Sequence, residues 1–153
     1  MSKIYAIDTN ALIEAAKNYN LSKKDFSFYW EKLNEMVDNK TLISSCEVFD
    51  EIKDEDLLQW CKKHKNMFVS LDKDIQLKVS QLLKDYPSLI KMQSSGNSNA
   101  DPSLFATAIV NGATIITNER ITNSVSNFHI PDVCKQLNVE CINLEKFNND
   151  IFE

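Results

Sequence analysis

Residues 100–119 read ADPSLFATAIVNGATIITNE and predict a helix, a stop and a buried strand in direct succession. Asp101 suits the N-cap of the helix, and Pro102 suits its first position. Apolar residues recur along one face of this helix, and Gly112 stands where a left-handed residue would end it. Residues 113–116, Ala-Thr-Ile-Ile, then predict a short buried strand that runs out at polar residues.

A carboxylate stands at each end of this unit, because Asp101 begins the helix and Glu119 follows the strand. Residues 3–8, Lys-Ile-Tyr-Ala-Ile-Asp, predict a second strand, which also ends in an acid. Its near-continuous apolar character indicates burial on both faces, as in a parallel sheet. Ligands of open α/β sheets bind beyond the carboxyl ends of the strands, so we expect these acids at one edge. A purely structural alternative is that Asp8 caps the helix beginning near residue 11.

The rest of the chain alternates between helical and strand patterns, which predicts an α/β fold with a parallel sheet. We interpret residues 1–153 as a single domain. The expected elements are a helix over about 26–39, a strand over 41–45, a helix from 46 to 53 continuing to about 65, a packed connection over 66–70, a helix from 72 to Pro87, a polar loop over 94–99, a short helix over 132–137, a strand over 139–143 and a terminal turn or helix over 144–147.

Composition and charge limit the classes of function. Seventeen basic and 22 acidic residues give a net charge of −5, which argues against a large non-specific nucleic-acid surface. The sequence has no apolar run of transmembrane length, and the first apolar run breaks at Asp8, so we expect a cytoplasmic protein without membrane association. Four cysteines without a CxxC pair, and two histidines distant from them, disfavour a zinc site.

Four carboxylates from distant segments form the candidate site: Asp8, Glu51, Asp101 and Glu119. Such a set without histidine or cysteine specifies a hard divalent cation, Mg²⁺ or Mn²⁺. This cation can orient and activate water against a phosphodiester. Should Glu51 lie on a solvated helix face, Glu47 is the next candidate.

The sequence resembles the PIN-domain family, and the resemblance covers nearly the whole chain. It rests on the order and spacing of four pieces: IYAIDTN at 4–10, ISS at 43–45 leading to VFDEI at 48–52, DPSLFATA at 101–108 and IITNE at 115–119. The resemblance implies a three-layer α/β/α fold with a central parallel sheet. It also implies acids that bind divalent metal and an enzyme that cuts RNA, often as the toxin of a toxin–antitoxin pair.

Carried over residue by residue, Asp8, Glu51 and Asp101 match the acids that the family shares most widely. Glu119 stands where an Asp is more usual. Asn10 matches the small polar residue two positions after the first acid, and Thr117 matches the polar residue two positions before the last.

The resemblance also implies partners. RNA is the expected substrate, and a cognate antitoxin or a second copy of the chain is the expected protein partner. Arg120, next to Glu119, and the pair Lys23 and Lys24 are the basic residues best placed to guide phosphates, although ordinary solvated charge explains them equally well.

Three functions compete at this point. The first is a metal-dependent endoribonuclease that hydrolyses single-stranded RNA. The second is a haloacid-dehalogenase-like phosphatase, which requires an Asp two positions after the first acid, where this chain has Asn10. The third is a non-catalytic PIN-like binding or scaffold protein, because a fold can be kept without its activity.

Overall fold

The computed structural model describes residues 3–85, 101–118 and 130–152, and only the backbone of Asp101 and of residues 130–133. Within these residues, five parallel strands form a central sheet in the order β3-β2-β1-β4-β5. The strands are β1 (Tyr5–Ile7), β2 (Leu42–Ser45), β3 (Phe68–Val69), β4 (Thr114–Ile116) and β5 (Cys141–Ile142).

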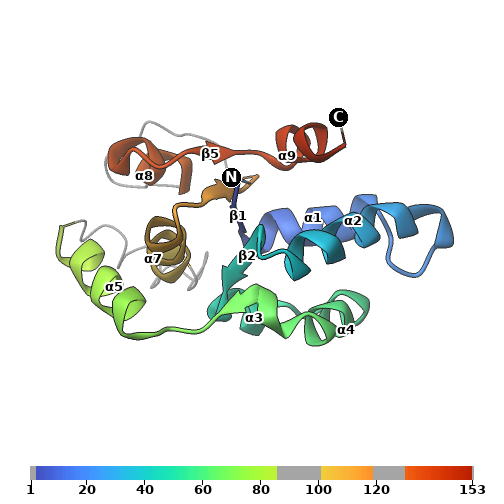
Figure 1. Cartoon of the computed structure of the whole chain (residues 1–153), viewed down its shortest axis with the longest axis horizontal. Coiled ribbons are helices and arrows are strands. Elements are labelled where there is room, and N and C mark those ends of the chain that lie inside the picture. The colour runs from blue at the N-terminus through green and yellow to red at the C-terminus, as the bar shows by residue number, and fades with distance from the viewer. Residues whose placement is uncertain (1–2, 86–100, 119–129, 153) are drawn as a thin grey trace.

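Helices cover both faces of the sheet, which gives three layers (Figure 1). One face carries α1 (Thr9–Asn18), α2 (Ser27–Asp38), α4 (Glu55–Lys63) and α9 (Leu144–Ile151). The other face carries α5 (Lys73–Asp85), α7 (Asp101–Asn111) and α8 (Ile130–Leu137). The short helix α3 (Cys46–Glu51) follows β2, and the single 3-10 turns η1 (Lys24–Phe26) and η2 (Lys65–Met67) complete the elements named here.

The central strand shows why the sheet is buried on both sides. Tyr5 and Ile7 belong to the core under α1, α2, α4 and α9, whereas Ala6 between them belongs to the core under α5, α7 and α8. Successive side chains of a strand point to opposite faces, so an apolar run fills both cores. Ile115 and Ile116 of β4 divide in the same way. The predicted α/β/α fold is therefore confirmed.

Strand register fixes which residues meet at the carboxyl edge. In β1, Ala6 pairs with Ile43 of β2, and Ile7 pairs with Ile116 of β4. Asp8 therefore leaves the sheet level with Thr117. The chain forms β2 and β3 on one side of β1 and then crosses to β4 on the other, which makes this edge the switch point of the sheet.

Several sequence-based boundaries were wrong. The connection predicted over 66–70 contains strand β3, whose two residues are too few to show a period in the sequence. The helix predicted from 46 to about 65 is broken, because Asp54 caps a new helix by accepting from Leu57 N at 3.0 Å. The terminal helix continues to Ile151 rather than ending at 147. The polar loop predicted over 94–99 lies outside the described residues.

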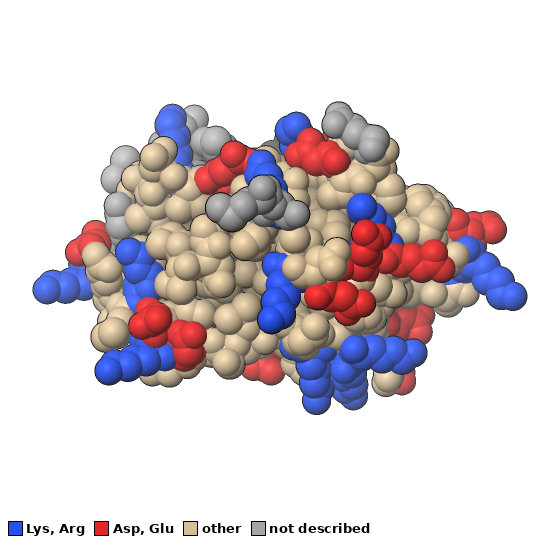
Figure 2. Space-filling model, in the orientation of Figure 1, with Lys and Arg blue, Asp and Glu red and all other residues tan. Residues whose placement is uncertain are grey.

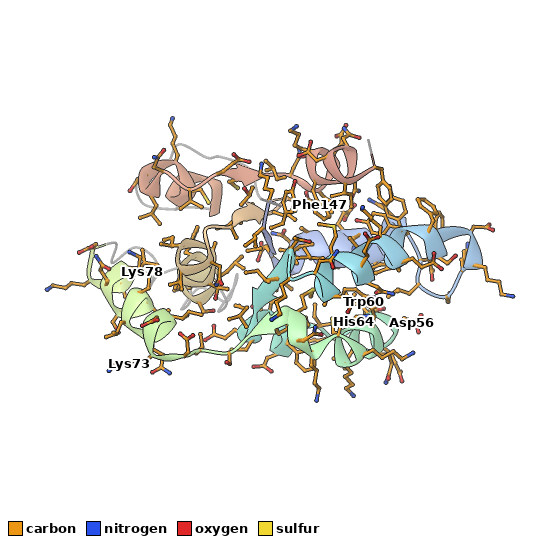
Figure 3. The ribbon with its side chains drawn as sticks, in the orientation of Figure 1. Asp56, Trp60, His64, Lys73, Lys78 and Phe147 are labelled. Carbon is orange, nitrogen blue, oxygen red and sulfur yellow. The ribbon has the colours of Figure 1, made fainter. Side chains whose placement is uncertain are left out.

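Two aromatic residues anchor the helices of one layer (Figure 3). Phe147 of α9 is fully buried and meets the ring of Tyr5 edge to face, with ring centroids 5.0 Å apart. Trp60 of α4 lies between α4 and α2, where its indole N–H donates to Asn34 Oδ1 at 2.9 Å. Gly112 ends α7 with a φ of +64°, the left-handed conformation expected from the sequence.

Within the described residues, none of the helices combines the length and the apolar character needed to cross a membrane.

Candidate functional site

Asp8 is a buried carboxylate at the carboxyl end of the central strand, and its side chain is only 2% exposed. Its Oδ1 accepts from the backbone N–H of Thr9 at 2.8 Å, which makes Asp8 the N-cap of α1. The positive end of the helix dipole therefore faces this carboxylate. The two interpretations of Asp8 from the sequence, a helix cap and an acid at the carboxyl edge of the sheet, are therefore compatible, because the residue that caps α1 also lies at that edge.

Thr117 connects Asp8 to the next strand. Its hydroxyl donates to Asp8 Oδ2 at 3.0 Å and lies 3.3 Å from Asn10 Oδ1. Asn10 Oδ1 also accepts from the backbone N–H of Asn118 at 3.0 Å. Hydrogen bonds thus join the residue at the end of β1, the first turn of α1 and the end of β4. These hydrogen bonds fix the orientation of the Asp8 carboxylate, because a buried polar network whose members are satisfied is rigid.

The start of α7 lies against the end of β2. Ser103 Oγ is 3.4 Å from Ser45 Oγ, and both side chains are buried. Ser45 is the last residue of β2 and the N-cap of α3. Asp101, which was predicted as the N-cap, is instead the first residue of α7, and its side chain lies outside the described set. The backbone thus brings Asp101 within two residues of the contact with β2.

Glu51 is the last residue of α3, a helix that packs against α1. Its side chain is half-buried, and its Oε1 is inaccessible to solvent. Glu51 therefore does not lie on a fully solvated helix face, the arrangement that would have favoured Glu47 instead.

Glu119 and Arg120 lie outside the described residues. Lys23 and Lys24 are exposed and follow the C-terminal end of α1, a ten-residue helix about 15 Å long that begins at the Asp8 cap. The convergence of all four predicted carboxylates stays a prediction. Among the described side chains, no group of three or more His, Cys, Asp or Glu residues could hold a metal ion.

The described side chains next to Asp8 offer oxygen ligands, namely the amide oxygen of Asn10 and the hydroxyl of Thr117. The other described side chains of the candidate site, Glu51 and the two serines Ser45 and Ser103, also carry oxygen. Hard cations such as Mg²⁺ and Mn²⁺ take oxygen ligands, so this donor chemistry fits them better than Zn²⁺.

Residues 5–150 match one family model, whose description is Domain of unknown function (DUF4411). This chain belongs to the DUF4411 family. A comparison with curated proteins found no match.

Among solved structures, the DUF4411 chain is similar to the crystal structure of VapBC2 from Rickettsia felis bound to a DNA fragment from their promoter. The TM-score is 0.51 at 17% sequence identity, over 92% of this chain and 98% of that chain. At this identity the likeness shows the fold. The fold is the PIN-like three-layer arrangement that the sequence resemblance implied.

The sequence did not single out several polar residues that the DUF4411 fold gathers around Asp8. Ser44 Oγ donates to the carbonyl of Ile7 at 2.6 Å, and Ser45 meets Ser103. The backbone N–H of Asn118 donates to Asn10 Oδ1 and so holds the Asn10 side chain in place. One signal was present, because β2 ends in two serines, and polar residues at the end of a buried strand lie at the ligand-binding edge.

Proposed function

We propose that this protein is a metal-dependent endoribonuclease that hydrolyses phosphodiester bonds of single-stranded RNA. The observation that carries the proposal is the buried carboxylate of Asp8, held by Thr9 N–H and the Thr117 hydroxyl at the switch point of a PIN-like sheet. Burying a carboxylate costs free energy unless other groups compensate the charge. A buried Asp8 that is held by hydrogen bonds therefore favours a functional role over an ordinary solvated charge.

Asp8, Glu51, Asp101 and Glu119 would hold the cation, which is Mg²⁺ or Mn²⁺ in this proposal. When bound, the cation supplies an activated water and offsets negative charge at the phosphate. The oxygen chemistry of the described side chains supports this assignment.

The chain's own residues supply orientation. The Thr117 hydroxyl and the Thr9 N–H each occupy one oxygen of Asp8, so the carboxylate plane has one favoured direction. Asn10 is held in turn by the N–H of Asn118. Groups fixed before the reaction begins need no reorganisation during it, which lowers the barrier. Arg120 is the proposed contact for a phosphate.

In this proposal water attacks the phosphorus directly, without a covalent enzyme intermediate. Burial raises the pKa of the Cys46 thiol, and it raises the pKa of Cys61 to about 12. A thiol with a raised pKa is a poor nucleophile at neutral pH. His64, the histidine within the described residues, has its Nδ1 2.8 Å from the carbonyl of Trp60.

Surface charge favours an unpaired strand over a duplex. The net charge is −5, and Figure 2 shows basic and acidic side chains of the described residues interspersed on one face. Duplex binding depends on neutralising many phosphates with Lys and Arg. Single strands can instead be bound through their bases, which every unpaired nucleotide exposes.

A cognate antitoxin is the proposed protein partner. A cavity of about 340 Å³ between α1 and α4 has Ile13, Ala16 and Leu57 among its apolar lining residues, and Asp54 and Asp56 among its acidic ones. An amphipathic segment with basic residues beside its apolar face is complementary to such a cavity. A homodimer is a second proposed assembly, and the mass of the purified protein in solution tests it.

The decisive experiment is a cleavage assay on unstructured RNA with Mg²⁺ or Mn²⁺. We expect cleavage by the wild type, none in EDTA and none by Asp8→Asn. Asp72→Asn is the matched control, because Asp72 also accepts a backbone N–H near a helix start, from Ile75 at 2.9 Å. Cleavage that persists in EDTA, or that is equal in Asp8→Asn, would refute the mechanism. A folded wild type that is inactive with both metals would favour the binding or scaffold function.

A further inference from the structure

A polar groove of about 420 Å³ runs between α1 and α9. Its volume lies in the range of small-ligand sites. Asparagine is its most frequent lining residue. Within the described residues, the lining asparagines are Asn18, Asn118, Asn143, Asn148 and Asn149. They come from three distant parts of the chain, so the groove exists only in the folded protein.

Three of these side chains have their acceptor oxygen already engaged. Asn118 Oδ1 accepts from Leu144 N at 3.0 Å, and Asn143 Oδ1 accepts from Lys146 N at 2.8 Å. Asn148 Oδ1 accepts from the Tyr29 hydroxyl at 2.7 Å. Backbone N–H groups can only donate, so they fix which end of the amide is oxygen. Asn118 and Asn143 therefore keep their Nδ2 amide groups as fixed donors, and Asn148 has its Nδ2 free of the Tyr29 contact as the hydroxyl donates in this structure.

Two carboxylates complete the groove, and they argue against a bound phosphate. Glu14 of α1 and Glu145 of α9 line it together with the asparagines. Carboxylates accept hydrogen bonds and repel anions. Fixed donors beside acceptors match the edge of a nucleobase, which carries ring nitrogens, carbonyl oxygens and amino groups.

The groove joins the candidate site directly. Asn118 lines the groove with its side chain, and its backbone N–H donates to Asn10, which also contacts the Thr117 hydroxyl. Thr117 donates in turn to Asp8. A strand with a phosphate near Asp8 would therefore reach the groove at Asn118.

Exposed aromatic rings lie next to the groove. Tyr19 lines it, and the ring of Phe28 is 6.4 Å from that of Tyr19 and 5.7 Å from that of Phe152. Phe28 is 53% exposed and Phe152 is 43% exposed. Unpaired bases stack on such rings irrespective of their sequence.

We propose that the α1/α9 groove is a base-binding subsite, which holds one unpaired nucleobase of the RNA strand next to the cleaved phosphodiester. The inference rests on the proposed ribonuclease function. The fixed amide groups donate to ring nitrogens or carbonyl oxygens of the base, and Glu14 or Glu145 accepts from its amino group. In adenine and cytosine the amino donor lies next to a ring-nitrogen acceptor, whereas in uracil the donor is the ring N3–H between two carbonyl oxygens. We propose that the subsite takes the first arrangement and therefore disfavours uracil.

NMR of ¹⁵N-labelled protein tests this subsite without requiring cleavage. The probes are hexaadenylate, hexacytidylate, hexauridylate and inorganic phosphate, each added in EDTA. We expect the hexaadenylate and hexacytidylate probes to shift the side-chain NH₂ signals of Asn143, Asn148 and Asn149, and to leave that of Asn34 in place. Hexauridylate should bind about fivefold more weakly. Inorganic phosphate should leave all four signals in place.

Two matched variants separate an effect at the groove from the effect of a more negative net charge. Asn148→Asp keeps an oxygen for the Tyr29 hydroxyl and loses the Nδ2 donor. Asn34→Asp makes the same change outside the groove, where Oδ1 accepts from the Trp60 indole N–H. We expect Asn148→Asp to weaken binding of hexacytidylate about fivefold or more, and Asn34→Asp to leave it unchanged.

The possible outcomes separate this inference from the nuclease function. Wild-type cleavage with no shift of the groove amides would overturn the subsite and leave the nuclease intact. Shifts of the same amides by inorganic phosphate would show an anion site instead. Equal weakening by Asn148→Asp and Asn34→Asp would show that the weaker binding comes from the net charge of the protein and not from the groove. Groove shifts in a protein that does not cleave RNA would support the subsite and contradict the nuclease.

Discussion

The hydroxyl of Thr117 donates a hydrogen bond to Oδ2 of Asp8 at 3.0 Å, although the two residues are 109 positions apart in the chain. Both side chains are 2% exposed. Parallel pairing of β1 with β4 creates this contact, because it brings the ends of the two strands level. The orientation of the proposed catalytic carboxylate therefore depends on the correct register of the central sheet.

Thr117→Val should destabilise the protein by about 1–3 kcal/mol, because it leaves a buried carboxylate oxygen without this donor. RNA cleavage should fall as well, since Asp8 loses its fixed direction. Urea unfolding and the cleavage assay measure the two effects. Thr117→Ser keeps the hydroxyl and serves as the control. Equal behaviour of the valine and serine variants would show that the hydrogen bond has no such role.

Asp8→Asn should leave the metal-free stability unchanged or raise it, because removing one of several like charges relieves repulsion. The amide still offers an oxygen to Thr9 N–H. Mn²⁺ should raise the melting temperature of the wild type, with about 2.7 kcal/mol of stabilisation at 100 times the dissociation constant. Calorimetry in EDTA and then in Mn²⁺ measures both parts. The same rise in Asp8→Asn as in Asp72→Asn would contradict a metal site at Asp8.

Phe147→Ala should reduce the free energy of unfolding by about 3–5 kcal/mol, because it removes a fully buried ring that packs on Tyr5. This loss would also loosen α9, which carries part of the polar groove. Phe152→Ala, at a half-exposed ring of the same region, should cost about 1 kcal/mol or less. Urea unfolding of both variants tests the difference, and similar losses would show that α9 is not anchored through Phe147.

Stability should decline at alkaline pH because of Cys61. Burial raises its pKa to about 12 in the folded state, whereas an unfolded cysteine titrates near ~8.5. A raised folded pKa gives stability that is complete below ~8.5 and is lost as pH rises toward the folded value. The loss approaches about 1.4 kcal/mol for each pH unit within this window. Burial also raises the pKa of Tyr29, which acts in the same direction above pH ~10.

Alkylation of the native protein at pH 9, followed by mass spectrometry, checks the buried thiol independently. Iodoacetamide should modify the partly exposed Cys141 well before Cys61, which is fully buried. Comparable rates at the two residues would contradict the burial and the raised pKa together.

The order of helices and strands could be predicted because each pattern is local. Apolar runs at residues 3–8 and 113–116 indicated buried strands, and Gly112 indicated the end of a helix. The two-residue strand β3 escaped prediction, since two residues cannot show a period. The break before α4 escaped because a capping aspartate resembles its acidic neighbours in the sequence.

For the candidate site, the sequence determined which residues are acidic and that Asp8 and Thr117 follow buried strands. Only the tertiary structure decided that Thr117 donates to Asp8, that Ser103 meets Ser45, and that asparagines from α1, from the segment after β4 and from α9 with its N-cap line one groove. The physical reason is that strand order and register, rather than any local pattern, place side chains of distant segments within hydrogen-bond distance.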